Sequence, residues 1–113
     1  MKTLLLLTAL FIASINYTYA QWTQLVSGST SDFYDVHIVN DSVGFVAGAN
    51  QILKTIDQGD TWVLHIPSNA SDSAKFLNTT FYGIYFVDGQ VGYACGNHAP
   101  SLNRIIFKTT DGG

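Results

Sequence analysis

Short apolar runs alternate with brief polar or glycine-rich gaps along the chain after residue 32. The first four runs predict β-strands at about 33–39, 43–48, 51–56 and 61–66. Turn-forming residues separate them, as in Asn40-Asp41-Ser42 and Gly48-Ala49-Asn50. These gaps are too short for the crossover that a parallel pair needs, about a dozen residues or more. The pattern therefore predicts antiparallel strands and an all-β fold.

The strand pattern repeats along the chain at an offset of 48 residues, and six further residues are inserted late in the second copy. The matching segments are Phe33–Val39 with Phe81–Val87, Val43–Gly48 with Val91–Gly96, and Ile52–Asp57 with Ile106–Asp111. Four strands in roughly 40–50 residues is the size of one propeller blade. An ordinary β-sandwich has strands of similar length, but the repeated four-strand unit favours a propeller. Pro67–Asn78, rich in Ser, Asn and Asp, is predicted to be a loop.

One octamer follows the third strand of the first unit, and its beginning recurs at the same place in the second. The octamer is Thr55-Ile56-Asp57-Gln58-Gly59-Asp60-Thr61-Trp62, and the second copy begins as Thr109-Thr110-Asp111-Gly112-Gly113. In such a turn an Asp carboxylate can accept hydrogen bonds from backbone amides, while threonine hydroxyls bond locally. A glycine supplies a backbone conformation that a side chain would oppose, and the tryptophan packs its large apolar ring.

This octamer resembles the Asp-box of BNR repeat proteins. Together with Phe-x-x-(Val/Ile) and Val-Gly-(Phe/Tyr)-x-x-Gly before it, the segment of about residues 22–113 resembles the photosystem II assembly and stability factor family of exported propellers. The wider Asp-box group includes sialidases and sortilin-type receptors. Two departures from the family pattern are Gln58, where glycine is typical, and the second copy, which lacks its Thr-Trp.

The resemblance implies a partial β-propeller with four-stranded antiparallel blades in residues 21–113. Blade 1 spans about residues 33–66, and blade 2 spans about 80–113 and is incomplete. In a closed ring, the segment Trp22–Val26 would be expected to complete the last blade. Without that partner, it is expected to be loosely placed or paired elsewhere. The resemblance also implies a structural Asp-box, away from the central face where ligands bind, formed by Thr55, Asp57, Gly59, Thr61, Trp62, Thr109, Asp111 and Gly113.

The N-terminal residues have the pattern of a signal peptide. Lys2 supplies a positive charge, Leu4–Ile15 is almost wholly apolar, and Thr18-Tyr19-Ala20 has small residues before the predicted cleavage after Ala20. The apolar run is shorter than the roughly 20 residues that a membrane-spanning helix needs. Residues 1–20 are therefore predicted to be removed on export, with no membrane insertion after cleavage. The expected location is secreted, periplasmic or at the cell surface.

Composition narrows the function further. Four basic residues and eight aspartates follow the predicted cleavage point, and the chain contains no glutamate. Because no basic residues cluster, nucleic acid is not an expected partner. A sialidase needs an arginine cluster to grip the substrate carboxylate and a Tyr–Glu pair, whereas this segment holds a single arginine, Arg104.

Other reactive side chains are expected to be structural. Cys95, the only cysteine, is expected to be buried in an apolar strand. The histidines His37, His65 and His98 lack metal-ligand spacing. No catalytic, metal-binding or cofactor-binding residues are predicted.

These observations predict a non-catalytic, exported propeller module that acts as an interaction scaffold for an unknown protein or glycan partner. The alternative is the N-terminal part of a sialidase-type glycan hydrolase whose catalytic residues lie in further blades. A photosystem assembly chaperone is a third possibility. With one complete blade and most of a second, the segment is not expected to form a stable closed domain by itself, since repeat architectures usually need about three repeats.

Overall fold

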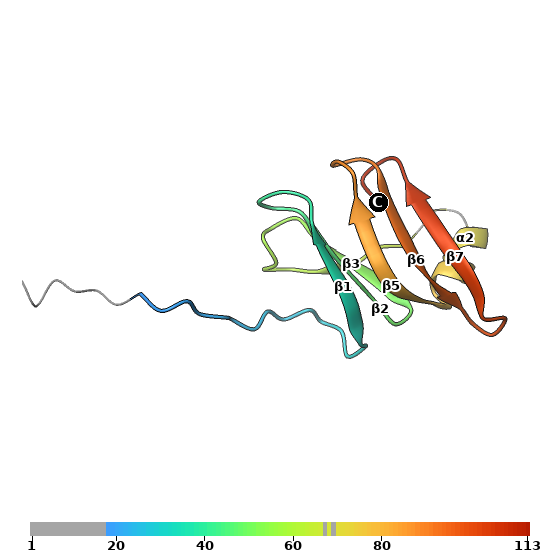
Figure 1. Ribbon diagram of the computed structural model, residues 1–113, viewed down its shortest axis with the longest axis horizontal. Coiled ribbons are helices and arrows are strands. Elements are labelled where there is room, and N and C mark those ends of the chain that lie inside the picture. The colour runs from blue at the N-terminus through green and yellow to red at the C-terminus, as the bar shows by residue number, and fades with distance from the viewer. Residues whose placement is uncertain (1–17, 67, 69) are drawn as a thin grey trace, which may run out of the picture.

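The computed structural model describes residues 18–66, 68 and 70–113. Apart from residues 18–20, the predicted signal peptide lies outside these ranges. The described chain forms two antiparallel sheets and one short helix, α2 (Ala70–Phe76). Figure 1 shows the two sheets beside each other, the first in teal and green and the second in orange and red. The prediction of an all-β fold with partial propeller blades is confirmed by this arrangement.

Each sheet follows the order of the chain. The first has the order β1 (Phe33–Ile38), β2 (Gly44–Gly48), β3 (Gln51–Thr55) and β4 (Val63–Leu64). The second has the order β5 (Thr79–Phe86), β6 (Gly92–His98) and β7 (Asn103–Thr109). All neighbouring strands pair antiparallel. The three longer strands of the first sheet lie where the hydrophobic pattern predicted them.

The turns that follow β1 and β5 have the same geometry. The side-chain carbonyl of Asn40 accepts hydrogen bonds from the amides of Ser42 and Val43, both at 2.9 Å. In the second sheet, the carboxylate of Asp88 accepts from Gln90 and Val91, both at 2.8 Å. A short side chain that accepts amides two and three residues on is what makes Asn and Asp good turn formers. The sequence repeat is therefore also a repeat of turn chemistry.

One predicted strand is shorter in the structure, and one segment lies outside both sheets as expected. The fourth strand, expected at 61–66, is only the two residues Val63–Leu64, because hydrogen bonds inside the preceding turn hold the chain up to Thr61. The segment Trp22–Val26, expected to be loosely placed in the absence of a closed ring, forms no strand, and the side chain of Trp22 is fully exposed. Figure 1 shows this segment, in blue, running away from both sheets.

The predicted loop between the sheets contains a helix instead. Within the described part of this connection, Ala70–Phe76 is helical, with Asp72 in the first turn and Lys75 in the last. These charges complement the helix dipole. The helix places Phe76, which is 6% exposed, against the ring of Phe81 at a centroid distance of 4.7 Å. The polar composition of this segment predicted a loop, but burial of this one apolar side chain stabilises a helix there.

The core lies between the two sheets, where β5 packs against β1 and β2. Phe45 of β2 stacks on Phe86 of β5, with ring centroids 4.1 Å apart and an interplanar angle of 14°. The buried cluster around this pair comprises Phe45, Ala47, Ile52, Phe76, Phe81, Ile84, Phe86 and Ala94. Burial of apolar surface at about 25 cal/mol per Å² makes this cluster the main attraction between the sheets.

A single carboxylate also ties the sheets together. Both β1 and β5 contain a register shift, at the equivalent residues Tyr34 and Tyr82. Just after each shift, a backbone amide points to Asp35. Its Oδ1 accepts from Val36 N and its Oδ2 from Ile84 N, both at 2.9 Å. Asp35 therefore satisfies the bulge amides of both sheets.

We expect Asp35→Ala to lower the free energy of unfolding by about 1–3 kcal/mol, because the partly buried Ile84 amide loses its acceptor. Urea denaturation followed by circular dichroism measures the change. Asp41→Ala, which alters an exposed aspartate in the β1–β2 turn, is the matched control. Equal stability of the two variants would show that Asp35 does not couple the sheets.

Candidate functional site

The predicted Asp-box octamer forms a closed turn between β3 and β4. The hydroxyl of Thr55 accepts from Gly59 N at 2.9 Å and donates to Asp57 Oδ1 at 2.8 Å. The same Oδ1 accepts from Thr61 N at 2.9 Å, while Oδ2 accepts the Thr61 hydroxyl proton. Gly59 has a φ of +95°, a conformation that glycine adopts without strain. Trp62 follows the turn, partly buried, with its ring beside Gly59.

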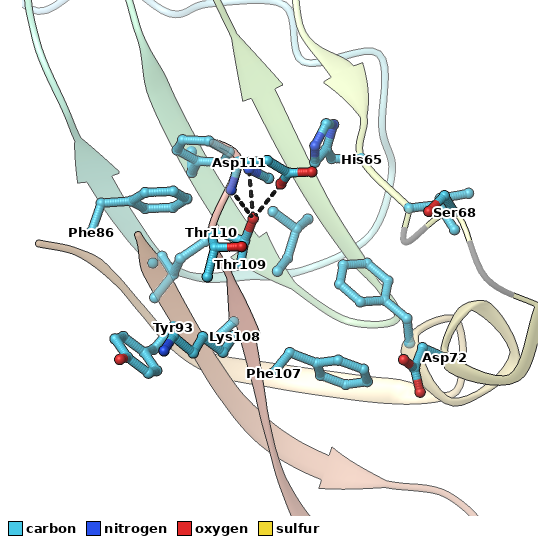
Figure 2. A pocket seen from close by; sticks show the side chains of 18 residues that line it. His65, Ser68, Asp72, Phe86, Tyr93, Phe107, Lys108, Thr109, Thr110 and Asp111 are labelled. Atoms are coloured by element: carbon cyan, nitrogen blue, oxygen red, sulfur yellow. Dashed lines mark hydrogen bonds between the residues drawn. The ribbon is translucent and has the colours of Figure 1, made fainter. Parts of the chain in front are cut away.

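The second copy of the motif repeats this geometry. The hydroxyl of Thr109 donates to Asp111 Oδ1 at 2.7 Å and accepts from Gly113 N at 2.8 Å. Figure 2 shows these bonds meeting at the Thr109 hydroxyl. The turn also contacts the first sheet, because Lys54 Nζ donates to the carbonyl of Gly112 at 2.7 Å. The structure thus brings together the turn residues that the sequence singled out, within each copy.

Hydrogen bonds lower the pKa of the two turn carboxylates. For Asp57, the largest cause is the bond from the Thr61 hydroxyl, followed by the Thr61 amide. The bond from the Thr109 hydroxyl is the largest cause of the lowered pKa of Asp111. For Asp88, in the β5–β6 turn, the Val91 amide has the largest effect. Each bond is made to the ionised carboxylate and favours it, so these groups stay charged at neutral pH.

We expect Asp57→Ala to lower the urea midpoint at pH 7, because Thr61 N and both threonine hydroxyls lose their acceptor. Asp60→Ala provides the control within the same turn, since Asp60 is exposed. The control should keep the wild-type midpoint. If both variants unfold at the same urea concentration as the wild type, the carboxylate does not hold the turn.

The difference in urea midpoint between the wild type and Asp57→Ala should also depend on pH, in a direction that the lowered pKa defines. The pKa of folded Asp57 lies below its ordinary value of 3.8. Its contribution is therefore fully present above about pH 4 and is lost as the pH falls through the folded pKa. The difference in urea midpoint between wild type and Asp57→Ala should shrink in acid. A difference in urea midpoint that stays constant down to about pH 2.5 would contradict a stabilising role for the ionised carboxylate of Asp57.

A cavity of about 380 Å³ opens between the sheets toward their outer strands. Its floor is formed by core side chains such as Phe45, Phe86 and Phe107, and its rim carries His65 and Asp111. Figure 2 shows helix α2 at one side and Asp111 beside His65 at the other. An apolar floor with a polar rim fits an apolar side chain or a small ligand. Most of its lining, however, belongs to the core that joins the sheets.

Aromatic side chains form a second feature, on the first strands of the two sheets. Tyr34 and Tyr82 occupy equivalent repeat positions and contact each other at a centroid distance of 5.0 Å, although they are 48% and 52% exposed. His37 and Tyr85, also equivalent, lie 4.9 Å apart in an edge-on arrangement. No binding role was predicted for these residues from the sequence. Their common repeat positions were the available signal.

The remaining reactive side chains are dispersed. His37 lies on β1, His65 at the cavity rim, and His98 at the end of β6, where its Nδ1 is 3.1 Å from the Lys75 carbonyl. Across the described ranges, no group of three or more His, Cys, Asp or Glu residues is placed to hold a metal ion. Likewise, the described part of the chain has no helix with the length and apolarity to cross a membrane.

The expectation that Cys95 is buried is wrong. Cys95 lies on β6 with its thiol on the exposed face of the second sheet. Strand alternation explains this, because its neighbour Ala94 points into the core and is 7% exposed. The apolar sequence around Cys95 gave no indication of which face it occupies.

Similarity to known proteins is found among solved structures. No protein-family profile and no curated protein matches this chain. Among solved structures, the chain is similar to one described as YCF48 bound to D1 peptide, with a TM-score of 0.63 and 24% sequence identity. The match covers 86% of this chain but only 29% of that one. At this identity the similarity concerns the fold, which is propeller-like.

Proposed function

We propose that this protein is a non-catalytic propeller module that acts as an interaction scaffold for a protein or glycan partner. The exposed aromatic contact between Tyr34 and Tyr82 carries the proposal. Tyrosine offers a large contact area with little conformational entropy to lose, and it is enriched where proteins bind partners. These two rings are held by rigid strands rather than by loops, so they are already ordered before a partner arrives.

A peptide is the first partner class to test. The similar solved structure contains a bound peptide, and tilted aromatic rings can pack apolar or ring-containing side chains. A glycan remains the second class, because the flat faces of sugar rings also pack on aromatic side chains. His37 and Tyr85 extend the same aromatic surface.

We further propose that the two octamer-type turns are Asp-boxes with a structural role. Their carboxylates are engaged within the turns, as at Asp57, where Oδ1 and Oδ2 both accept from Thr61. A carboxylate already bonded to its own turn is a poor candidate for catalysis. The tyrosines and the turns therefore have separate tasks, one in binding and one in stability.

Binding to peptide and glycan arrays tests the scaffold proposal. We expect the double variant Tyr34→Ala/Tyr82→Ala to lose most of the signal of any ligand that the wild type captures, because both rings supply its contact surface. Trp22→Ala, which removes a fully exposed aromatic side chain outside the sheets, should bind like the wild type. The urea midpoint of each variant shows whether a lost signal reflects unfolding.

Two results would contradict the proposal. One is a wild-type protein that captures nothing from either array. The other is release of product from a fluorogenic sialoside, which would favour the sialidase alternative.

We also propose that the protein is exported, with cleavage between Ala20 and Gln21, on the basis of the signal-peptide pattern. N-terminal sequencing of the protein recovered outside the cytoplasm should begin at Gln21. Replacing Leu6 and Leu7 with Asp should abolish export, because it interrupts the apolar region. Recovery of the chain with Met1 intact in the exported fraction would contradict cleavage.

A further inference from the structure

Tyr34 and Tyr82 form a contact between two phenol rings that belong to different sheets. They occupy the bulges of β1 and β5, and their ring centroids lie 5.0 Å apart with an interplanar angle of 53°. At this separation the edges of two aromatic rings are in contact. The contact joins two residues of the same chain, so it does not depend on what covers the outward faces of the sheets.

Hydrogen bonds on both sides of Tyr82 tie its backbone to the first sheet. The carboxylate of Asp35, the residue after Tyr34, accepts from the Ile84 amide at 2.9 Å. On the other side, the Asn50 amide donates to the Thr79 carbonyl at 3.1 Å. The surrounding backbone therefore holds the two phenol rings beside each other. A reaction between groups that are already in contact needs no encounter step and little reorganisation.

Both phenols are open to solvent, since Tyr34 is 48% exposed and Tyr82 is 52% exposed. An oxidant can therefore reach them. The proposed export would bring the chain to oxidising conditions, in which covalent cross-links persist. This sequence contains a single cysteine, so no disulfide can form within it. A bond between the two tyrosine rings would supply the covalent link between sheets that cysteine does not.

We propose that Tyr34 and Tyr82 are a modification site, at which oxidation joins the two rings into a dityrosine. A peroxidase that uses hydrogen peroxide removes one electron and one proton from each phenol, and the peroxide is reduced to two molecules of water. The two phenoxyl radicals couple through ring carbons next to the oxygens, which forms one carbon–carbon bond. Each of these carbons then loses its hydrogen as a proton while its oxygen regains one, so both rings become aromatic phenols again.

The cross-link ties β1 of the first sheet to β5 of the second. A covalent bond between residues far apart in the sequence restricts the unfolded chain, and this raises stability. The urea midpoint of the cross-linked protein should therefore exceed that of the unmodified protein. The bond also fixes the aromatic surface at which the proposed partner binding occurs.

Treatment of the purified full chain with a haem peroxidase and hydrogen peroxide tests the proposal. Dityrosine fluorescence should appear in a product that migrates as a monomer on a denaturing gel, with a yield per molecule that does not depend on protein concentration. Mass spectrometry of a digest should show the peptides of Tyr34 and Tyr82 joined, with the loss of two hydrogen atoms. Oxidation of Cys95 adds oxygen instead, so mass separates the two products.

Conservative variants locate the reaction. Tyr34→Phe and Tyr82→Phe should each lose the monomeric dityrosine signal, because phenylalanine has no phenol hydrogen to give up. Tyr93→Phe is the matched control, since Tyr93 is 40% exposed and its ring lies against Lys108. This control should give the wild-type yield. The urea midpoint of each untreated variant shows that it is folded.

Three results would overturn the proposal. The first is a folded wild type that forms no dityrosine under these conditions. The second is a monomeric dityrosine signal that persists in Tyr34→Phe or in Tyr82→Phe. The third is dityrosine found only in cross-linked dimers, with a yield that rises with protein concentration, because the rings would then react between chains rather than within one.

Discussion

The stacking of Phe45 on Phe86 is the contact on which the rest of the structure depends. It fixes β2 of one sheet against β5 of the other, and the buried cluster gathers around it. A short β-sheet has two faces and cannot be stable in water with both apolar faces exposed. Here each sheet covers one face of the other. The arrangement of the two described sheets follows from this contact and the cluster around it.

Hydrogen bonds then fix the relative position of the two sheets, which the apolar contact alone does not determine. Asp35 joins the bulges of β1 and β5 through its two oxygens, and Lys54 joins the first sheet to the turn after β7. Hydrophobic attraction is not directional, whereas these bonds have defined donors and acceptors. They start from different strands of the first sheet, Asp35 on β1 and Lys54 on β3. These directional bonds therefore add to the Phe45–Phe86 stack in fixing the position of one sheet against the other.

Much of this fold could be predicted from the sequence because it is local and repeated. Short apolar runs and turn residues located β1, β2 and β3, and the octamer at Thr55–Trp62 indicated a closed turn. The parts that sequence could not predict depend on contacts between elements. Helix α2 forms because Phe76 packs against Phe81 and Phe107. The polar residues around Phe76 in the sequence do not indicate these contacts. The exposure of Cys95 depends on which sheet covers which face.

The candidate binding surface was missed for a related reason. Tyr34 and Tyr82 look like ordinary strand residues, and only the packing of β1 beside β5 makes them neighbours. The same repeat positions show where the two units have diverged. Phe45 is replaced by Tyr93 and Ala47 by Cys95, which preserves an apolar face, but Asp35 is replaced by Gly83. The second sheet therefore has no counterpart of the bond that Asp35 makes to the neighbouring sheet. The two units thus share their apolar pattern and their turn chemistry, while the hydrogen bond between sheets depends on one residue, Asp35, that differs between them.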